Sequence, residues 1–545
     1  MQIHGDAKSL KEQGDSLFSK KRPYDSRNQD IADNFFVERA DFTVSRGLGD
    51  DYAAHLATGY PAMVRRDLGN SLGSMLRPKE LQWFHTGVEQ EDTIDHDGIE
   101  WLEWSTGLQR KAMYDRKSMF TRATKEGDQD YSAFGGNAIS CELNRRDQSL
   151  IYRCWHLRDV SWTEDSYGQH NATHRNWKPT ATELCAFFGD KVHSEVAKLK
   201  SEGKGSTPIL VRHAVIRSDE YTGGAKFKRY PWVSVYIDVT NGHIMQEVGS
   251  WTKIYNIARW ATVSGSPYPY SPASVIALPD ARLLQAMTFT LLDAGEMAVK
   301  PPTIGVAEAI RGDLNLFAGG FTAVDAEYDE RLGEVLRPLT QDKSGLGYGM
   351  EMSDRTAALI REAFYLNTLS MPPAGGPDMT AYEVGQRVQE YIRQALPLFE
   401  PIEDDYNAGL CDLTFETLMA AGAFGPPDTI PESIRGRDVS FKFESPLSTM
   451  IERQKGQKLM ESQALIALAV EADPTAGKVL NFKEALRDSL HGIGTPASWM
   501  NSKSEVAAEE EAEKEMQNSA AMLDTMQKGA DVASTLSQVS GEFDG

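Results

Sequence analysis

The chain of 545 residues contains few cysteines, and their spacing excludes a framework built on cysteine. The four cysteines are Cys141, Cys154, Cys185 and Cys411, and no two of them form a CxxC pair. A disulfide scaffold or an all-cysteine metal site requires more cysteines at closer spacing. We therefore interpret them as small apolar side chains of a protein that works in a reducing compartment.

The sequence also lacks a long uninterrupted apolar run. No stretch approaches the roughly 18 apolar residues that cross a bilayer, and the opening residues, MQIHGDAKSLKEQGD, hold no apolar signal-peptide core. We expect a protein that is neither secreted nor embedded in a membrane, and we expect no membrane partner.

The motifs that carry common enzyme chemistry are absent. The segment SEGKGSTP at 201–208 lacks the GxxxxGK[ST] spacing of a phosphate loop, and GLGYGM at 345–350 follows no strand of a βαβ unit. HExxH does not occur, and the carboxylates form no distinctive pair. The one GxSxG match, GNSLG at 69–73, falls inside the helical pattern at 60–76 and not at a strand-to-helix turn. The sequence therefore predicts no enzyme and no cofactor, with 201–208 as a surface turn and 345–350 as a loop or hinge.

A metal site is not expected either. His170 and His174, with Cys154 and His156 earlier in the chain, are the nearest approach to a ligand set. The stretch SYGQHNATH around the two later histidines is typical of a loop, so the helical i,i+4 pair of zinc enzymes is missing.

Positive charge is in deficit. Lys and Arg number 57 against 79 Asp and Glu, a formal net charge of −22. A protein that grips nucleic acid without sequence preference usually carries a basic surface, so tight wrapping of DNA is disfavoured. The acidic balance fits either a surface past which DNA moves without sticking or ordinary solubility. The basic clusters at 21–27, 145–153 and 226–229 are interpreted as ordinary charged surface rather than phosphate contacts.

The chain up to about residue 276 has the pattern of an α+β region. Helical patterns occupy 9–21 and 60–76, and strand patterns occupy 149–162, 207–219 and 230–251. In the last of these, Val233, Val235 and Ile237 alternate with polar residues before a TNG turn, which predicts a β-hairpin.

The next part predicts two helices around an insertion. A helix is expected to start near Pro279 and run to about 300, with Leu284, Met287 and Leu291 on its apolar stripe. Short runs separated by glycine at 301–348 predict a small β-containing insertion. A second helix is expected from Ser353, with Ile360 and Phe364 on its apolar stripe.

The stretch SMPPAGGPDMTAYEV at 370–384 then breaks the helical pattern. Three prolines and two glycines lie within 372–377, and Thr380 with Glu383 matches a capping box that restarts a helix. Pro397 and Pro401 are expected to kink or stop that helix. A strand pattern follows at 438–445. The acidic, alanine-rich tail from about 504 is either a solvated helix or partly disordered.

Four segments in this order resemble one family. They are IADNFFVERADFT (31–43), ALPDARLLQAMTFTLLDAGEMAVKPP (277–302), MTAYEVGQRVQEYIRQALPLFEPIEDD (379–405) and FESPLSTMIERQK (443–455). They resemble elements of the portal, or head-to-tail connector, proteins of short-tailed (podovirus) bacteriophages.

The resemblance implies an α+β portal fold with a wing, a two-helix stem, a small β-containing clip, a tunnel loop and a helical C-terminal crown. In these terms the expected parts are the N-terminal wing (1–276), first stem helix (277–300), clip (301–349), second stem helix (350–369), tunnel loop (370–379), kinked wing helix and strand (380–475), and helical crown with acidic tail (476–545).

The resemblance further implies a structural role. Such a protein forms a ring, typically of twelve copies, at the unique capsid vertex, and DNA is packaged and ejected through its channel. Its implied partners are the terminase large subunit, the head–tail adaptor and tail proteins, the major capsid and scaffolding proteins, and double-stranded DNA. The implied location is the virion, with assembly in the host cytoplasm.

The candidate site residues are those of the tunnel loop. The resemblance implies that they face DNA in the channel, and they are Ser370, Met371, Pro372, Pro373, Ala374, Gly375, Gly376 and Pro377. Without the resemblance, the same stretch is a surface loop between two helices. Two alternatives remain for the whole protein. One is another tail or internal virion protein, and the other is a DNA-translocating ATPase or a nuclease, for which the sequence has no phosphate loop or metal-binding carboxylate cluster.

Overall fold

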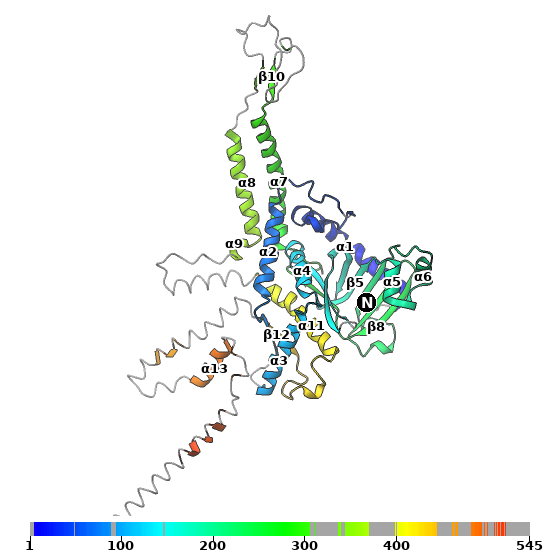
Figure 1. Ribbon diagram of the computed structural model, residues 1–545, viewed down its shortest axis with the longest axis vertical. Coiled ribbons are helices and arrows are strands. Elements are labelled where there is room, and N and C mark those ends of the chain that lie inside the picture. Colours follow the sequence, from blue (N-terminus) through cyan, green and yellow to red (C-terminus); the bar gives the residue numbers. More distant parts are fainter. Residues whose placement is uncertain are drawn as a thin grey trace, which may run out of the picture. The chain divides into compact units, whose positions relative to one another are not determined.

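The computed structural model describes residues 5–47, 49–88, 94–144, 148–305, 344–369 and 400–443, with a strand at 336–338, a helix at 481–492 and isolated positions elsewhere. The chain divides into two compact units, Met1–Trp83 with Gln109–Phe424, and Phe84–Leu108 with Gly425–Gly545. Helices and antiparallel strands are mixed in the first unit (Figure 1), which confirms the predicted α+β class.

Two long helices open the first unit, as the helical patterns predict. Helix α1 (Ala7–Phe35) begins at Asp6, whose carboxylate accepts a hydrogen bond from the Ser9 backbone N–H. It is longer than the predicted segment and continues through Pro23. Helix α2 (Tyr60–Leu76) carries Pro61 in its first turn, where the missing N–H has no intrahelical acceptor to lose.

A five-stranded antiparallel sheet forms the larger β layer. Its order is β4-β5-β6-β7-β8, and its strands are β4 (Val160–Glu164), β5 (His170–Trp177), β6 (Val211–Arg217), β7 (Trp232–Asp238) and β8 (His243–Ser250). The predicted hairpin is confirmed, because Val235 of β7 pairs with Glu247 of β8 and all three alternating apolar residues are fully buried.

The two faces of this sheet are covered by different helices. Leu10 of α1 packs with Val233, Val235 and Ile237 on one face. The short helices α5 (Ala181–Phe188) and α6 (Ser194–Ser201) pack with Val211 and Met245 on the other. Because successive residues of a strand point to opposite faces, both faces of the sheet are buried.

A smaller sheet follows directly from a helix. Helix α4 (Phe120–Phe134) ends at Gly135 and leads into a three-stranded sheet of order β3-β2-β9, with β2 (Gly136–Asn144), β3 (Ser149–Cys154) and β9 (Tyr255–Arg259). A π-helical turn, η8 (Ile402–Asn407), and helix α11 (Ala408–Ala420) pack beside it, where the Tyr152 and Thr414 hydroxyls lie 2.7 Å apart.

Helix α7 (Pro272–Val299) corrects the predicted start near Pro279. The Ser271 hydroxyl accepts a hydrogen bond from the Ser274 N–H and donates one to the Ser132 carbonyl of α4, so the helix begins at Pro272. Pro279 lies inside it. By length and composition α7 is apolar enough to cross a membrane, with a mean hydropathy of 1.3 over an 18-residue window of which 22% is buried. This hydropathy was not expected, because the sequence contains no long uninterrupted apolar run.

Helix α8 (Ser344–Ala363) corrects the predicted loop at 345–350 and the predicted start at Ser353. Its first turns contain the glycines of GLGYGM, and a Cβ at Gly349 would lie 2.9 Å from Cδ2 of Leu291 in α7. These glycines therefore belong to a helix that packs closely on its neighbour. The two helices lie side by side (Figure 1), and their far ends lead to the antiparallel strands β10 (Thr303–Gly305) and β11 (Leu336–Pro338).

The end of α8 is fixed by aromatic side chains. Phe364 is fully buried, with its ring centroid 5.2 Å from that of Phe35 in α1. Tyr365 has a φ of 57°, a left-handed conformation that stops the helix, and the short helix α9 (Leu366–Leu369) follows. The predicted apolar stripe is confirmed at Ile360 and Phe364, which are both fully buried.

The second unit contains a two-stranded sheet and helix α3. Strand β1 (Phe84–Val88) pairs antiparallel with β12 (Val439–Phe443), which confirms the predicted strand at 438–445. Val88, Leu102 and Ile434 form its small apolar core. Helix α3 (His96–Met113) runs from this unit into the first, and α13 (Phe482–Gly492) is a further helix of the second unit.

Gly135 is required for two reasons, which predicts a measurable difference between glycines. Its φ is +78°, and a Cβ there would lie 2.0 Å from the backbone carbon of Tyr270. Gly168 has a similar φ of +76°, but a Cβ at that position would meet no atom within 4 Å. We expect Gly135→Ala to destabilise the fold by about 3 kcal/mol and Gly168→Ala by about 1 kcal/mol.

Urea denaturation followed by circular dichroism measures both variants. Equal losses of stability at the two positions would show that the Tyr270 backbone does not pack against Gly135 and that only the shared φ matters.

Candidate functional site

The predicted channel residues lie outside the part of the chain that the structure describes. This holds for all of 370–377 and for the capping-box residues Thr380 and Glu383. Their role as a tunnel loop therefore stays a prediction. The structure does define the chain leading to them, because Phe364 and Leu366 are buried immediately before residue 370.

The residues considered as metal ligands are structural. His170 and His174 lie in strand β5, so the loop predicted around them is wrong. Burial lowers the pKa of His170 to about 4 and that of His174 to about 3, so both rings are neutral at pH 7. Among the described residues, no group of three or more His, Cys, Asp or Glu side chains is placed to hold a metal ion.

The cysteines confirm their sequence interpretation in part. All four are free thiols, and Cys141 and Cys411 are buried while Cys154 and Cys185 are half-buried. Burial raises the pKa of Cys141 to about 12, which leaves it protonated and unreactive at neutral pH.

The most distinctive surface belongs to helix α7. Large apolar side chains along its length are exposed, namely Ile276, Leu283, Phe289, Leu292, Met297 and Val299, with exposed fractions of 62, 45, 48, 57, 48 and 81%. Ile276, Leu283 and Met297 are separated by multiples of seven residues, the spacing of a helix seam that packs against another helix. We call these six residues the α7 apolar face. Contiguous exposed apolar surface of this kind is typical of a protein–protein contact.

The base of α7 is firmly held while its apolar face is open. Gln285 is buried; its side-chain oxygen accepts hydrogen bonds from the backbone N–H groups of Ala57 (2.8 Å) and Thr58 (3.0 Å), and its nitrogen donates to the Thr58 carbonyl. Arg282 lies 3.3 Å from Asp30 of α1. Polar contacts therefore position the base of the helix, while six of its large apolar side chains remain exposed.

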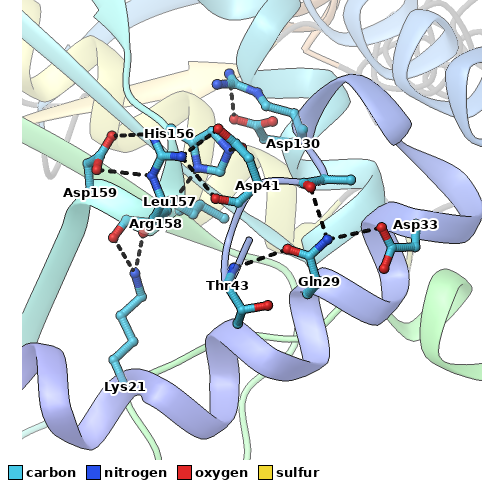
Figure 2. Close-up of polar contacts among 12 residues, drawn as sticks. Lys21, Gln29, Asp33, Asp41, Thr43, Asp130, His156, Leu157, Arg158 and Asp159 are labelled. Atoms are coloured by element: carbon cyan, nitrogen blue, oxygen red, sulfur yellow. Dashed lines mark hydrogen bonds and ion pairs between the residues drawn. The ribbon is translucent and has the colours of Figure 1, made fainter. Parts of the chain in front are cut away.

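A buried polar cluster fixes α1, and Figure 2 shows it. We call it the α1 hub; its ionisable members are Lys21, Asp25, Arg39, Asp41, Asp130, His156, Arg158 and Asp159. Lys21 is fully buried, donates to the carbonyls of Leu157 and Arg158, and lies 3.2 Å from Asp25. Burial lowers the pKa of Lys21 to about 8, an effect that Asp25 partly offsets.

Gln29 joins α1 to the segment that follows it. Its side-chain nitrogen donates to the Ala40 carbonyl and to Asp33, both at 3.0 Å, and its oxygen accepts from the Thr43 N–H at 3.1 Å. The segment 40–43 lies within the resembling stretch IADNFFVERADFT. One buried amide thus satisfies backbone groups that would otherwise lose their hydrogen bonds to water.

Asp41 is the centre of the hub's ion pairs. Nε2 of His156 lies 2.7 Å from one carboxylate oxygen, and Nη1 of Arg158 lies 2.5 Å from the other. His156 Nδ1 accepts a hydrogen bond from the Arg158 N–H, so Nε2 is the ring nitrogen that faces Asp41. Partial burial alone would raise the pKa of Asp41, but His156 and Arg158 outweigh it and lower the pKa to about 2.

A second carboxylate of the hub comes from α4. Asp130 is 1% exposed and accepts from Nη2 of Arg39 at 3.1 Å (Figure 2). Burial raises its pKa, and the charge of Arg39 opposes that shift. Nearby, Cζ of Arg65 lies 3.7 Å from the Phe36 ring centroid. The hub therefore ties α1, the segment 36–43 and α4 into one body and offers no accessible catalytic group.

The hub also corrects one interpretation of a basic cluster. The segment 21–27 was expected to be ordinary charged surface, but Lys21 is fully buried and Arg27 donates to the Pro269 carbonyl. Residues 226–229 do lie at the surface apart from the buried Phe227, and Lys226 is 3.6 Å from Glu247. Part of 145–153 lies outside the described residues. The predicted surface turn at 201–208 is confirmed between α6 and β6.

The chain also matches a known protein family. Residues 7–500 match the family described as bacteriophage head to tail connecting protein. Because the match spans most of the chain, the protein belongs to this family, whose members are structural components of phage particles. The sequence resemblance is thereby confirmed at the level of the family.

A relative shares much of the chain. It is the "Probable portal protein" of Bordetella phage BPP-1, 24% identical over 446 residues that cover 79% of this chain and 77% of the relative. Two solved structures were also matched, described as "Virion of native gene transfer agent (GTA) particle" and "Neck of empty GTA particle computed with C6 symmetry". They are 10% identical, with TM-scores of 0.33 and 0.34, and cover 75 and 80% of this chain and 90 and 93% of those chains.

The Asp41 ion pairs predict a pH dependence of stability. The folded pKa of about 2 lies below the ordinary value near 3.9, so the stabilisation is present above about pH 4 and is lost as the pH falls towards 2. We expect Asp41→Asn to destabilise the protein by about 2 kcal/mol at pH 6 and by progressively less below pH 4.

Urea midpoints of the two proteins at a series of pH values measure this difference. The exposed Asp190→Asn is the control, and its difference from the wild type should show no such trend. A gap between wild type and Asp41→Asn that stays constant down to pH 2 would contradict the assignment.

Proposed function

We propose that the protein is the portal of a phage particle, a ring of about twelve copies around a DNA channel at one capsid vertex. The observation that carries the proposal is the α7 apolar face on a helix whose other side is fixed to the body of the chain. Family membership supports a place between head and tail. The resemblance of the four sequence segments supports the short-tailed type of particle.

In this proposal α7 is the first stem helix, and its exposed apolar residues pack against a neighbouring copy. Burying apolar surface contributes about 25 cal/mol per Å², and Ile276, Leu283 and Met297, which share one side of the helix, offer the next copy an apolar strip. Helix α7 has the hydropathy of a membrane span but carries charged residues, such as Asp280 and Arg282, near its base. Packing between copies would account for this combination, because the apolar residues would be buried in protein and not in lipid.

The two-helix pair then defines the remaining parts. Helix α8 is the second stem helix, and the short β10–β11 pair at the far ends of both helices belongs to the clip. Because the clip connects two antiparallel helices, it projects at one end, where it would dock the terminase large subunit during packaging and the tail adaptor afterwards. The major capsid and scaffolding proteins would meet the wing.

The tunnel loop of the proposal is 370–379. The buried Phe364 and the left-handed Tyr365 hold the chain just before it, so a loop starting there has a fixed base. Prolines and glycines at 372–377 present few donors to phosphate. The charge of −22 per copy would likewise favour sliding of DNA over gripping. ATP hydrolysis would belong to the terminase, so the protein itself would not be an enzyme.

The α7 apolar face can be tested by introducing charge. We expect Ile276→Asp combined with Leu283→Asp to prevent ring formation, because each carboxylate would have to be buried against the neighbouring copy. Native mass spectrometry of the purified protein measures the number of subunits.

Tyr167→Asp is the matched control, since Tyr167 is 91% exposed and lies in the loop between β4 and β5. The control should assemble like the wild type, and circular dichroism should show that all variants are folded. Rings of unchanged size in the double variant would refute the placement of α7 between copies. A wild type that stays monomeric or dimeric under all conditions would overturn the portal proposal itself.

The tunnel loop is tested by shortening it. Removing 372–377 should leave rings intact and change DNA packaging or retention, because only the channel lining is altered. Particle assembly with nuclease protection of the packaged DNA measures the effect. Normal packaging and retention by the shortened protein would identify 370–379 as a plain connector.

A further inference from the structure

A dense group of cations surrounds the start of α4. Residues 110–125 contain six basic residues, Arg110, Lys111, Arg116, Lys117, Arg122 and Lys125, against a single acid, Asp115. The rest of the chain is strongly acidic, so this segment departs sharply from the overall balance. We call these six residues together with Lys79 the α4 basic patch; the Nη2 of Arg110 donates to the Lys79 carbonyl at 2.7 Å, which joins the two segments.

Most of these charges have no counter-charge. Arg122 lies 3.2 Å from Glu126. Within the described residues, Lys79, Lys111, Arg116, Lys117 and Lys125 have no carboxylate within 4 Å, and all five are exposed. Elsewhere the surface lysines Lys198 and Lys204 each lie 3.1 Å from a neighbouring glutamate. Exposed cations without an ion pair also occur singly elsewhere, as at Lys8, Lys20 and Lys178, but here four of them lie within residues 111–125 and are available to an external anion.

The patch borders a cavity of 200 Å³ between α2 and α4. Lys79 and Lys125 line it, together with Arg77 and Asp128. Arg77 and Asp128 are both buried and hydrogen-bonded to each other, so their charges cancel. Arg77 also donates to Asn407 at 2.6 Å. The net charge of the lining comes from the two lysines.

Two glycines let α2 pack closely on α4 beside this cavity. A Cβ at Gly73 would lie 2.7 Å from Oδ2 of Asp128, and one at Gly69 would lie 2.6 Å from Nε2 of Gln129. Both line the cavity. Any larger residue on that side of α2 would push against α4 or fill the space.

Neutral donors complete the lining. The side-chain oxygen of Asn70 accepts from Gln129 at 3.2 Å, and the two N–H donors of Asn70 have no partner among the described residues. The Thr121 hydroxyl, in the first turn of α4, has no partner among the described residues. Two ammonium groups and two neutral donors around one cavity suit an anion with several acceptor oxygens.

We propose that the α4 basic patch binds the phosphate backbone of double-stranded DNA, with one phosphate at the cavity and its neighbours along Lys111, Arg116 and Lys117. A phosphodiester strand repeats its charge and so suits several unpaired cations that lie within one short segment of the chain. The phosphates of duplex DNA carry a denser and more regularly repeated negative charge than the side chains of an acidic protein segment, which favours DNA as the occupant.

This inference rests on the proposed portal function, which explains why DNA is present. The contact that it assigns is separate from the tunnel loop. The tunnel loop offers DNA an apolar surface, whereas the α4 basic patch holds it. On a chain with a net charge of −22, non-specific attraction elsewhere is weak. The patch would therefore account for most of the salt-dependent binding.

The test compares two double variants of the full-length protein. Lys79→Gln with Lys125→Gln removes the two charges at the cavity, and Lys198→Gln with Lys204→Gln removes two lysines already paired with glutamates. Fluorescence anisotropy with a short labelled DNA duplex, measured between about 50 and 200 mM salt, gives the affinity and its salt dependence. The cavity variant should bind several-fold more weakly, with a log–log salt slope smaller by about 2.

The control variant should bind like the wild type. Equal affinity and slope in both variants would overturn the proposal. Displacement of the duplex by polyglutamate as effectively as by unlabelled DNA of equal charge would also overturn it and assign the patch to an acidic protein partner. Native mass spectrometry of each variant tests the portal proposal separately. Rings that form without binding DNA would contradict only the DNA contact, and DNA binding without rings would contradict only the portal proposal.

Discussion

The rest of the first unit depends on the contact between the carboxyl end of α4 and the start of α7. Gly135 ends α4 with a left-handed φ of +78° and lies directly against the Tyr270 backbone. One residue later, the Ser271 hydroxyl donates to the Ser132 carbonyl and caps α7. The Ser271 hydroxyl thus satisfies both a carbonyl near the end of α4 and a backbone N–H at the start of α7. This double contact fixes the direction in which α7 leaves the sheets.

Charged side chains of the α1 hub hold the elements around α1 in one arrangement. In the α1 hub, Lys21 is fully enclosed, and Asp41 and Asp130 are each met by an arginine. A buried ion pair contributes little by itself to stability, because desolvation opposes the attraction. Removing one partner is far more harmful, so such a cluster allows one arrangement of α1, the segment 36–43 and α4 and penalises the alternatives. If the protein assembles into the proposed ring, this uniqueness of conformation would let each subunit fit identical neighbours.

The contrast between the α7 apolar face and the α4 basic patch shows how one chain presents two kinds of surface. The first leaves apolar area unburied where a helix is otherwise well anchored. The second leaves cations unpaired on an acidic chain. Both are surfaces whose local interactions are incomplete within the single chain, and each calls for a partner of matching chemistry. Neither has the enclosed, polarised geometry of a catalytic pocket.

Local patterns in the sequence determined the elements that depend on near neighbours. The alternation at Val233, Val235 and Ile237 fixed a hairpin, and the α+β class and the strand at 438–445 followed from similar periodicity. The family was recognisable from four segments in order. The ends of elements that depend on distant residues could not be predicted from the sequence. Helix α7 starts at Pro272 because the Ser271 hydroxyl donates to the Ser132 carbonyl of α4, and the glycines of GLGYGM are helical because Gly349 packs on Leu291. In the same way, the basic residues of 21–27 and of 110–125 look alike in the sequence. In the structure Lys21 is buried beside Asp25, whereas Lys111 and Lys117 are exposed and have no ion pair among the described residues. Sequence reports which charges are present, and only the tertiary structure decides which are paired, because an ion pair depends on the distance between residues that the fold brings together.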